Sequence, residues 1–160
     1  MKTTLLTPET DENAVKTAAE LIRAGEVVGM PTETVYGLAA NALNGEAVKK
    51  IFLAKGRPQD NPLIVHIADF EQIYDLCPAV PPQAKQLADA FWPGPLTMIV
   101  PKGGCIPDEV SCGLDTVGIR LPSHPMARAL IQESGVPLAA PSANTSGRPS
   151  TTTAAHVMHD

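Results

Sequence analysis

The chain has 160 residues and a formal net charge of −5, from 12 basic and 17 acidic side chains. That length corresponds to one domain and is sufficient to bury a core without disulfide or metal support. Hydrophobic residues make up 44% of the chain and charged residues 18%, which excludes an intrinsically disordered protein. The acidic balance excludes an overall positive field for nucleic acid or anionic membranes, so any such binding must be local.

Cysteine usage and hydropathy indicate the compartment. The three cysteines, Cys77, Cys105 and Cys112, are an odd number without CxxC spacing, and the sequence shows no signal peptide. No apolar run approaches the ~18 residues that span a bilayer. We therefore expect a reduced, cytoplasmic protein that has no membrane partner.

Proline is the unusual component. The chain has 16 prolines, about twice the usual share of residues, and all but Pro8 and Pro31 lie between residues 58 and 149. Because each interior proline costs a helix roughly 3 kcal/mol, this distribution excludes a helical bundle.

Helical and strand patterns alternate along the chain. Apolar residues at helical spacing predict a helix over residues 11–25, a short β-branched run predicts a strand over 26–30, and Pro31 then opens a loop. The same criteria predict, in order, a helix over 46–54, a strand over 61–67, helices over 70–76 and 82–91, a turn over 92–95, strands over 96–100 and 116–121, a helix over 125–133, a strand over 137–140 and a polar loop over 142–150.

This order predicts a single α/β domain over residues 1–160 with at least a partly parallel sheet. The irregular spacing and the prolines argue against a regular doubly wound repeat. Residues 151–160 have the pattern of the first turns of a helix, beginning near Ser150, whose packing partners the chain does not supply. We therefore expect the domain to be incomplete at its C-terminus.

The common catalytic signatures are absent from the sequence, including Walker A, GxGxxG, GxSxG and HExxH. His156 and His159 stand three residues apart, which is typical of a solvated helix face and does not make a metal site.

A local basic cluster is more informative. Lys55 and Arg57 flank Gly56, and Pro58 restricts the backbone of Arg57 to extended conformations. A fixed pair of cations suits a polyphosphate ligand.

Two further polar residues lie in apolar strand patterns. Arg120 ends the run at 117–119, so it must either pair with a carboxylate, Asp115 or Glu33, or face a ligand anion. His66 is either a hydrogen-bonded core residue or a ligand residue, and the sequence leaves both alternatives open. The loop over 141–150 offers hydroxyl, amide and guanidinium groups of the kind that bind phosphate or ribose oxygens.

Five ordered motifs carry a resemblance to a known family. They are PTETVYGL at 31–38, KGRPQDNPLIVH at 55–66, WPGPLT at 92–97, DTVGIR at 115–120 and PSANTSGRPS at 141–150. In this order they resemble the motifs of the YrdC-like family, the threonylcarbamoyl-adenylate synthases, from about residue 15 to the last residue.

The resemblance implies a YrdC-type twisted mixed sheet, flanked by helices, around a deep basic cavity. It also implies that L-threonine, bicarbonate and ATP, with Mg²⁺, give threonylcarbamoyl-AMP and pyrophosphate. Partner proteins then pass the threonylcarbamoyl group to tRNA. Carried over by position, the L-threonine contacts are Thr32, His66, Arg120 and Ser142, and the ATP contacts are Lys55, Arg57, Thr116, Ser142, Asn144 and Ser150. No residue is identified as a general base, which predicts catalysis by juxtaposition.

Two alternatives to the synthase remain at this point. One is a regulatory member that uses the basic cavity to bind double-stranded RNA, or tRNA, without making the adenylate. The other is a carbamoyl-adenylate domain like that of hydrogenase-maturation proteins, although the zinc-finger and acylphosphatase-like segments expected beside it are not present. Family members also continue with a further strand and a Ser/Thr-bearing loop that completes the cavity, which this sequence does not contain.

Overall fold

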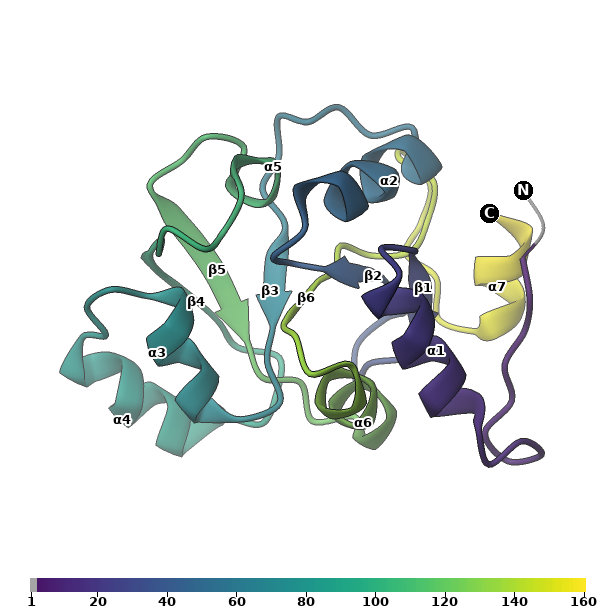
Figure 1. Cartoon of the computed structure of the whole chain (residues 1–160), viewed down its shortest axis with the longest axis horizontal. Helices are drawn as coiled ribbons and strands as arrows, with labels where there is room; N and C mark the ends of the chain where they lie inside the picture. Colours follow the sequence, from purple (N-terminus) through teal and green to yellow (C-terminus); the bar gives the residue numbers. More distant parts are fainter. Residues whose placement is uncertain (1–2) are drawn as a thin grey trace.

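A six-stranded mixed sheet forms the centre of the protein, in the order β1-β2-β6-β3-β5-β4 (Figure 1). The computed structural model describes residues 3–160. The strands are β1 Val28–Met30, β2 Gly37–Asn41, β3 Ile64–His66, β4 Thr97–Pro101, β5 Thr116–Arg120 and β6 Leu138–Ala139. The helices are α1 Ala14–Arg23, α2 Gly45–Lys55, the 3-10 turn η1 Phe70–Gln72, α3 Ile73–Leu76, α4 Pro82–Phe91, α5 Asp108–Ser111, α6 Pro125–Ser134 and α7 Ala154–His159.

Parallel pairing is confined to β3 and β5, whereas β1–β2, β2–β6, β6–β3 and β5–β4 are antiparallel. The expectation of a partly parallel sheet in an α/β domain is therefore confirmed. In the parallel pair, His66 lies opposite Arg120 and Val65 opposite Ile119. This register places the two polar residues side by side.

Helices cover the two faces of the sheet unequally. On one face, α2, α3, α4 and α5 pack over all of the central strands, and Val65, Val117 and Ile119 point into this first core. On the other face, α1 and α6 lie against each other over β1, β2 and β6 and form a second core (Figure 1). Within residues 3–160, no residue of β3, β4 or β5 belongs to the second core. One half of that face is thus left without a helix.

Most predicted elements are present, with ends that differ by at most three residues. The helix predicted over 82–91 is α4, and the strand predicted over 116–121 is β5. Strand β2 and helix α5 are not among the predicted elements. Strand β2 has the sequence Gly-Leu-Ala-Ala-Asn, whose intrinsic strand preference is low, and it is held by β1 and β6 on either side.

The expected helix start at Ser150 is wrong. Helix α7 begins at Ala154, and the Thr153 side chain caps it by accepting a hydrogen bond from the backbone N–H of His156. Of the described helices, none combines the length and the apolar character that a membrane crossing requires.

Candidate active site

Arg120 and His66 lie next to each other at the carboxyl ends of β5 and β3. Both side chains point away from the first core, because Val65 and Ile119 occupy the core positions beside them. His66 is 3% exposed and Arg120 is 8% exposed. A buried cation needs compensating partners, and Arg120 finds them within the protein.

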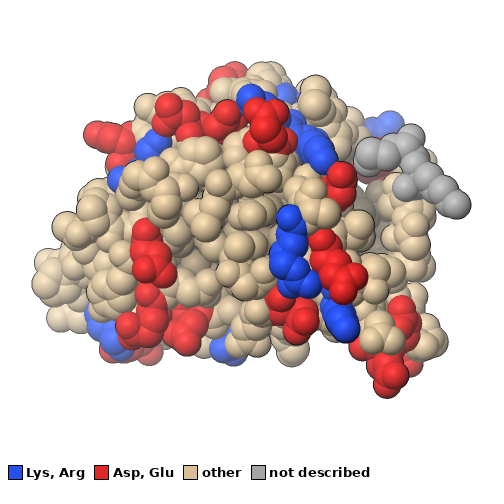
Figure 2. All heavy atoms as spheres, in the orientation of Figure 1, with Lys and Arg blue, Asp and Glu red and all other residues tan. Residues whose placement is uncertain are grey.

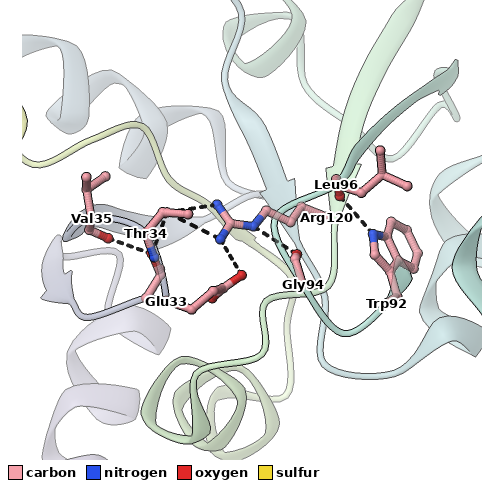
Figure 3. A network of polar contacts seen from close by, with 8 residues as sticks. Glu33, Thr34, Val35, Trp92, Gly94, Leu96 and Arg120 are labelled. Carbon is pink, nitrogen blue, oxygen red and sulfur yellow. Dashed lines mark hydrogen bonds and ion pairs between the residues drawn. The ribbon is translucent and has the colours of Figure 1, made fainter. Parts of the chain in front are cut away.

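Arg120 is held by three groups from two loops (Figure 3). Its Nη2 atom lies 2.5 Å from Glu33 Oε1, its Nε donates to the Gly94 carbonyl at 3.3 Å, and both Nη atoms lie 3.4 Å from the Thr34 hydroxyl. Glu33 is therefore the carboxylate partner, and Asp115 is not. Burial tends to raise the pKa of Glu33, but hydrogen bonds from Arg120 and from backbone N–H groups, together with the positive charge of Arg120, outweigh this and hold that pKa below its usual value.

Thr32 shapes the loop that carries Glu33. Its hydroxyl donates to the Val35 carbonyl at 2.6 Å and accepts from the Thr34 N–H at 3.2 Å, which is a local turn of the kind that Ser and Thr side chains form. The structure thus brings Glu33 and Thr34, rather than Thr32, into contact with Arg120. Sequence reasoning raised Glu33 only as an alternative partner, and nothing in the sequence pointed to the Gly94 carbonyl.

His66 is uncharged at neutral pH. Burial, and then the nearby charge of Arg120, lower the pKa of His66 to about 4. Its Nδ1 lies 3.1 Å from the Ile64 carbonyl, which can only accept, so Nδ1 carries the proton and Nε2 is left as an acceptor. A neutral acceptor next to a cation suits a ligand that has both a hydroxyl and a carboxylate.

Lys55 lies at the other end of the site, as the last residue of α2. Asn44 caps the first turn of this helix, and Gly56, with a φ of 58°, ends it. Lys55 is 2% exposed, and its Nζ donates to the carbonyls of Ser142 and Asn144. Burial, and then the charge of Arg57, lower the pKa of Lys55 to about 8. One lysine thereby holds the loop after β6 against the end of α2.

An open hollow of about 250 Å³ adjoins Lys55, and it is lined by Lys55, Arg57, Pro58, Asp60, Asn61, Ser142, Asn144, Ser146 and Gly147. Arg57 Nη2 donates to the Asn61 carbonyl at 3.0 Å. Asn144 is 8% exposed, and its Oδ1 is buried without a hydrogen-bond partner. In the part of the chain that the structure describes, neither Lys55 nor Arg57 forms an ion pair. The hollow therefore combines two cations that are outside any ion pair with one carboxylate, Asp60, and a buried acceptor without a partner.

Two of the expected ATP contacts lie outside this hollow. Thr116 begins β5, four residues before Arg120, a separation of about 13 Å along a strand. Ser150 lines a second hollow of about 330 Å³, together with Arg148, Pro149, Thr151, His156, His159 and Asp160. Over residues 3–160, no group of three or more His, Cys, Asp or Glu side chains is arranged to hold a metal ion.

The uncovered half of the sheet connects the two ends of the site. Thr116, Gly118 and Arg120 alternate with the core residues of β5 and so share its uncovered face. Ile99 of β4 lies opposite Gly118 and is 76% exposed. A side chain at Gly118 would come within 3.1 Å of Thr97 Cγ2. Because Gly118 has no side chain, this face of the sheet is shallow there, and an extended ligand can lie on it between Lys55 and Arg120.

The loops after β1 and β6 form a wall beside this surface. Tyr36 donates from its N–H to the Thr151 carbonyl at 2.8 Å, and its carbonyl accepts from the Ala143 N–H at 2.8 Å. The Leu38 N–H donates to the Pro141 carbonyl at 2.9 Å. Residues 31–36, which reach Arg120, are thereby fixed to residues 141–151, which reach Lys55.

Comparisons with known proteins point to one family. The sequence profile of the Sua5, YciO and YrdC proteins, described as telomere recombination, matches residues 20–160. The threonylcarbamoyl-AMP synthase of Bacillus subtilis is 59% identical over 155 residues, a match that covers 94% of this chain and 44% of the relative. The chain thus spans less than half the length of this curated relative.

Solved structures give the same result. The crystal structure of P. abyssi Sua5 complexed with L-threonine matches with a TM-score of 0.92 and 55% identity, over 94% of this chain and 44% of that chain. Full-length HypF in its phosphate- and nucleotide-bound form matches with a TM-score of 0.80 and 25% identity, over 94% of this chain and 19% of that one. The profile match and the level of identity show that the chain belongs to the Sua5/YciO/YrdC family.

Proposed function

We propose that the complete protein is a nucleotidyltransferase that makes threonylcarbamoyl-AMP and pyrophosphate from L-threonine, bicarbonate and ATP. The observation that carries this proposal is the pair of cationic ends, Arg120 and Lys55 with Arg57, joined by the uncovered face of the sheet. Relatives at 59% and 55% identity are named threonylcarbamoyl-AMP synthases, and the P. abyssi protein was crystallised with L-threonine.

L-threonine is assigned to the Arg120 end. The guanidinium can take the amino acid carboxylate through two parallel hydrogen bonds, and the free Nε2 of His66 can accept from the threonine hydroxyl. Thr32 and Ser142 complete the proposed amino-acid contacts, although the Thr32 hydroxyl would first have to leave the Val35 carbonyl. ATP is assigned to the Lys55 end, with contacts from Lys55, Arg57, Thr116, Ser142, Asn144 and Ser150.

The reaction has two stages. In the first, the neutral amine of L-threonine forms a bond from nitrogen to the bicarbonate carbon, and the displaced hydroxide leaves with an amine proton as water, which gives the carbamate. The second stage consists of two bond changes at phosphorus. An oxygen of the threonine carbamate attacks the α-phosphorus, and the bond from that phosphorus to the β-phosphate oxygen breaks, so that the electron pair leaves with pyrophosphate. Lys55 and Arg57 stabilise the charge that builds on the phosphate oxygens, and the rigid loops hold the two substrates in line. We assign no side chain the role of general base, so the ammonium proton of L-threonine is released to solvent before the carbamate forms.

Mg²⁺ fits this site as a companion of ATP. Asp60 is the one carboxylate among the residues that line the hollow beside Lys55, and a single carboxylate is typical of sites where Mg²⁺ keeps its waters and binds through substrate phosphates. Bound in that way, the ion would neutralise charge on the triphosphate. Asp60 would then help to hold the ion beside Lys55 and Arg57.

The product would be consumed in tRNA modification, where partner proteins pass the threonylcarbamoyl group to an adenosine, and we propose that this takes place in the cytoplasm. The double-stranded RNA alternative is less favoured. On the one face drawn in Figure 2, blue and red side chains are interspersed around a broad uncharged area, so this face does not offer the continuous basic surface that RNA binding needs. The relatives at 59% and 55% identity are named as synthases. The HypF alternative rests on 25% identity, against 55% for Sua5.

Pyrophosphate release tests the proposal. The complete protein is assayed with ATP and bicarbonate, with and without L-threonine, beside an Arg120→Ala variant. We expect release that requires L-threonine and falls by roughly 100-fold in the variant, as for the loss of a bidentate charged contact. Release that does not depend on L-threonine, or an unaffected variant, would contradict the assignment of Arg120.

A further inference from the structure

We propose that Glu33 is an internal substitute for the substrate carboxylate, which holds the Arg120 guanidinium in the free protein and is displaced when the amino acid binds. The inference rests on the proposed function, because it takes L-threonine as the ligand of Arg120. It adds a residue that lowers the affinity for the amino acid and has no part in the chemistry.

The first argument is the charge of Arg120. Its side chain is nine-tenths buried, and a guanidinium in such a place is costly unless a negative group neutralises it. Glu33 Oε1 at 2.5 Å is the one carboxylate within ion-pair distance of Arg120 among the described residues. When the amino acid binds, one carboxylate replaces another, so that Arg120 is neutralised before and after the exchange.

The second argument is the geometry of the pair. Glu33 reaches Arg120 through a single oxygen and a single nitrogen, and the remaining contacts, to Gly94 and Thr34, are long at 3.3 and 3.4 Å. The guanidinium has five N–H donors, and a carboxylate placed in its plane can take two of them in parallel. An incoming carboxylate therefore gains a better arrangement than the one it displaces.

The third argument is that Glu33 has somewhere to go. Its side chain is 21% exposed, twice the fraction of the Arg120 side chain, and it lies on the loop between β1 and β2 (Figure 3). Thr32 and Tyr36 fix the backbone on either side of it through hydrogen bonds to Val35, Thr151 and Ala143. A rotation of the Glu33 side chain into water is sufficient, and the loop does not have to open.

Competition of this kind has a measurable consequence. The apparent affinity for a ligand falls in proportion to the fraction of protein in which its site is free. Removal of the Glu33 charge should therefore strengthen the binding of ligands that have a carboxylate and leave other ligands unchanged. A residue that contacted the threonine ammonium would have the opposite effect, and a purely structural residue would not distinguish the two ligands.

The test compares L-threonine with L-threoninamide, which lacks the carboxylate, on the complete protein and its Glu33→Gln variant. Titration calorimetry measures both affinities, and the fluorescence of Trp92, which is next but one to Gly94, follows binding independently. We expect Glu33→Gln to bind L-threonine about threefold to tenfold more tightly and L-threoninamide with unchanged affinity. Glu26→Gln is the matched control, because it removes the same charge from an exposed pair with Lys50.

Each result has a distinct meaning. Weaker binding of both ligands would show that Glu33 contacts the ammonium, and unchanged binding of both would show that no competition exists, so either result overturns the inference and leaves the proposed function standing. If neither the wild-type protein nor Glu33→Gln binds L-threonine, the proposed function is overturned as well. If thermal unfolding shows that Glu33→Gln is misfolded, Glu33→Asp, which keeps the charge but shortens its reach, should also tighten L-threonine binding and not L-threoninamide binding.

Discussion

The two ends of the candidate site treat their positive charge in opposite ways. At the amino-acid end, formed by Arg120, His66 and Glu33, a carboxylate neutralises the cation and the histidine is uncharged. At the nucleotide end, formed by Lys55, Arg57 and residues 141–151, Lys55 donates only to backbone carbonyls and Arg57 to the Asn61 carbonyl. In the free protein the positive charge of the amino-acid end is neutralised, whereas the nucleotide end retains its positive charge.

The difference teaches what each ligand must do on binding. A triphosphate brings several negative charges, and an end whose cations are not held in an ion pair within residues 3–160 can attract it without first breaking one. An amino acid brings one carboxylate, and its site is neutral only if that carboxylate replaces the one already there. Ligand affinity at the nucleotide end should therefore depend on the total charge of the site and its ligand. Ligand affinity at the amino-acid end should depend on replacement of the Glu33 carboxylate and on the shape of the ligand.

The largest expected effect comes from the two cations of the nucleotide end. Lys55→Met should weaken ATP binding by roughly 100-fold and lower the free energy of unfolding by about 1–3 kcal/mol, because it leaves the Ser142 and Asn144 carbonyls without their donor. Arg57→Ala should weaken ATP binding by about tenfold with little change in stability, since its side chain is only half-buried. Calorimetry with ATP and urea unfolding measure these effects. Equal loss of L-threonine binding in Arg57→Ala would break the division into two ends.

A pH titration should separate two properties of Lys55. Its pKa of about 8 in the folded protein lies below the value of 10.5 for a free lysine. Between these values the unfolded chain binds more protons, so the contribution of Lys55 to the free energy of unfolding rises with pH. ATP affinity should fall over the same window, because the ammonium loses its charge. ATP affinity that stays constant from pH 7 to 10, or that falls equally in Lys55→Met, would contradict this role.

A substitution on the surface between the ends should affect both ligands. Gly118→Ala places a methyl group 3.1 Å from Thr97 Cγ2 and 3.7 Å from Ile64 Cγ1, where the proposed substrates cross the sheet. We expect catalytic turnover to fall by about tenfold, while stability changes by less than about 1 kcal/mol because alanine suits a strand better than glycine. Gly104→Ala, at a position where a Cβ would contact nothing within 4 Å, is the control.

The smallest expected effect concerns the prolines. Pro58 lines the hollow beside Arg57, and Pro141 precedes Ser142 in the loop held by Lys55. Replacing either with alanine should weaken ATP binding by about twofold to fivefold, because the loop would then lose more conformational entropy on binding. The free energy of unfolding should change less than the binding free energy. A larger effect on stability than on binding would assign these prolines to the fold alone.

Local sequence patterns were sufficient to predict most of the helices and strands. Helix α4 and strand β5 were predicted within a residue of their ends, because apolar periodicity and the flanking proline and glycine residues are properties of neighbouring positions. Strand β2 and helix α5 could not be predicted in this way. The alanines of β2 form a strand because β1 and β6 supply its hydrogen bonds, and β6 comes from almost 100 residues later in the chain.

The site divides in the same way. The sequence alone was sufficient to select the candidate site residues, since the five motifs contain Lys55, Arg57, His66, Arg120 and Asn144. It also restricted Arg120 to a carboxylate partner or a ligand. Only the tertiary structure identified the carboxylate partner, by bringing Glu33 to Arg120 across 87 residues of chain. It alone also showed that Lys55 fastens the loop at Ser142, likewise 87 residues away. Such contacts are set by the order of the strands in the sheet, and no pattern of neighbouring residues encodes that order.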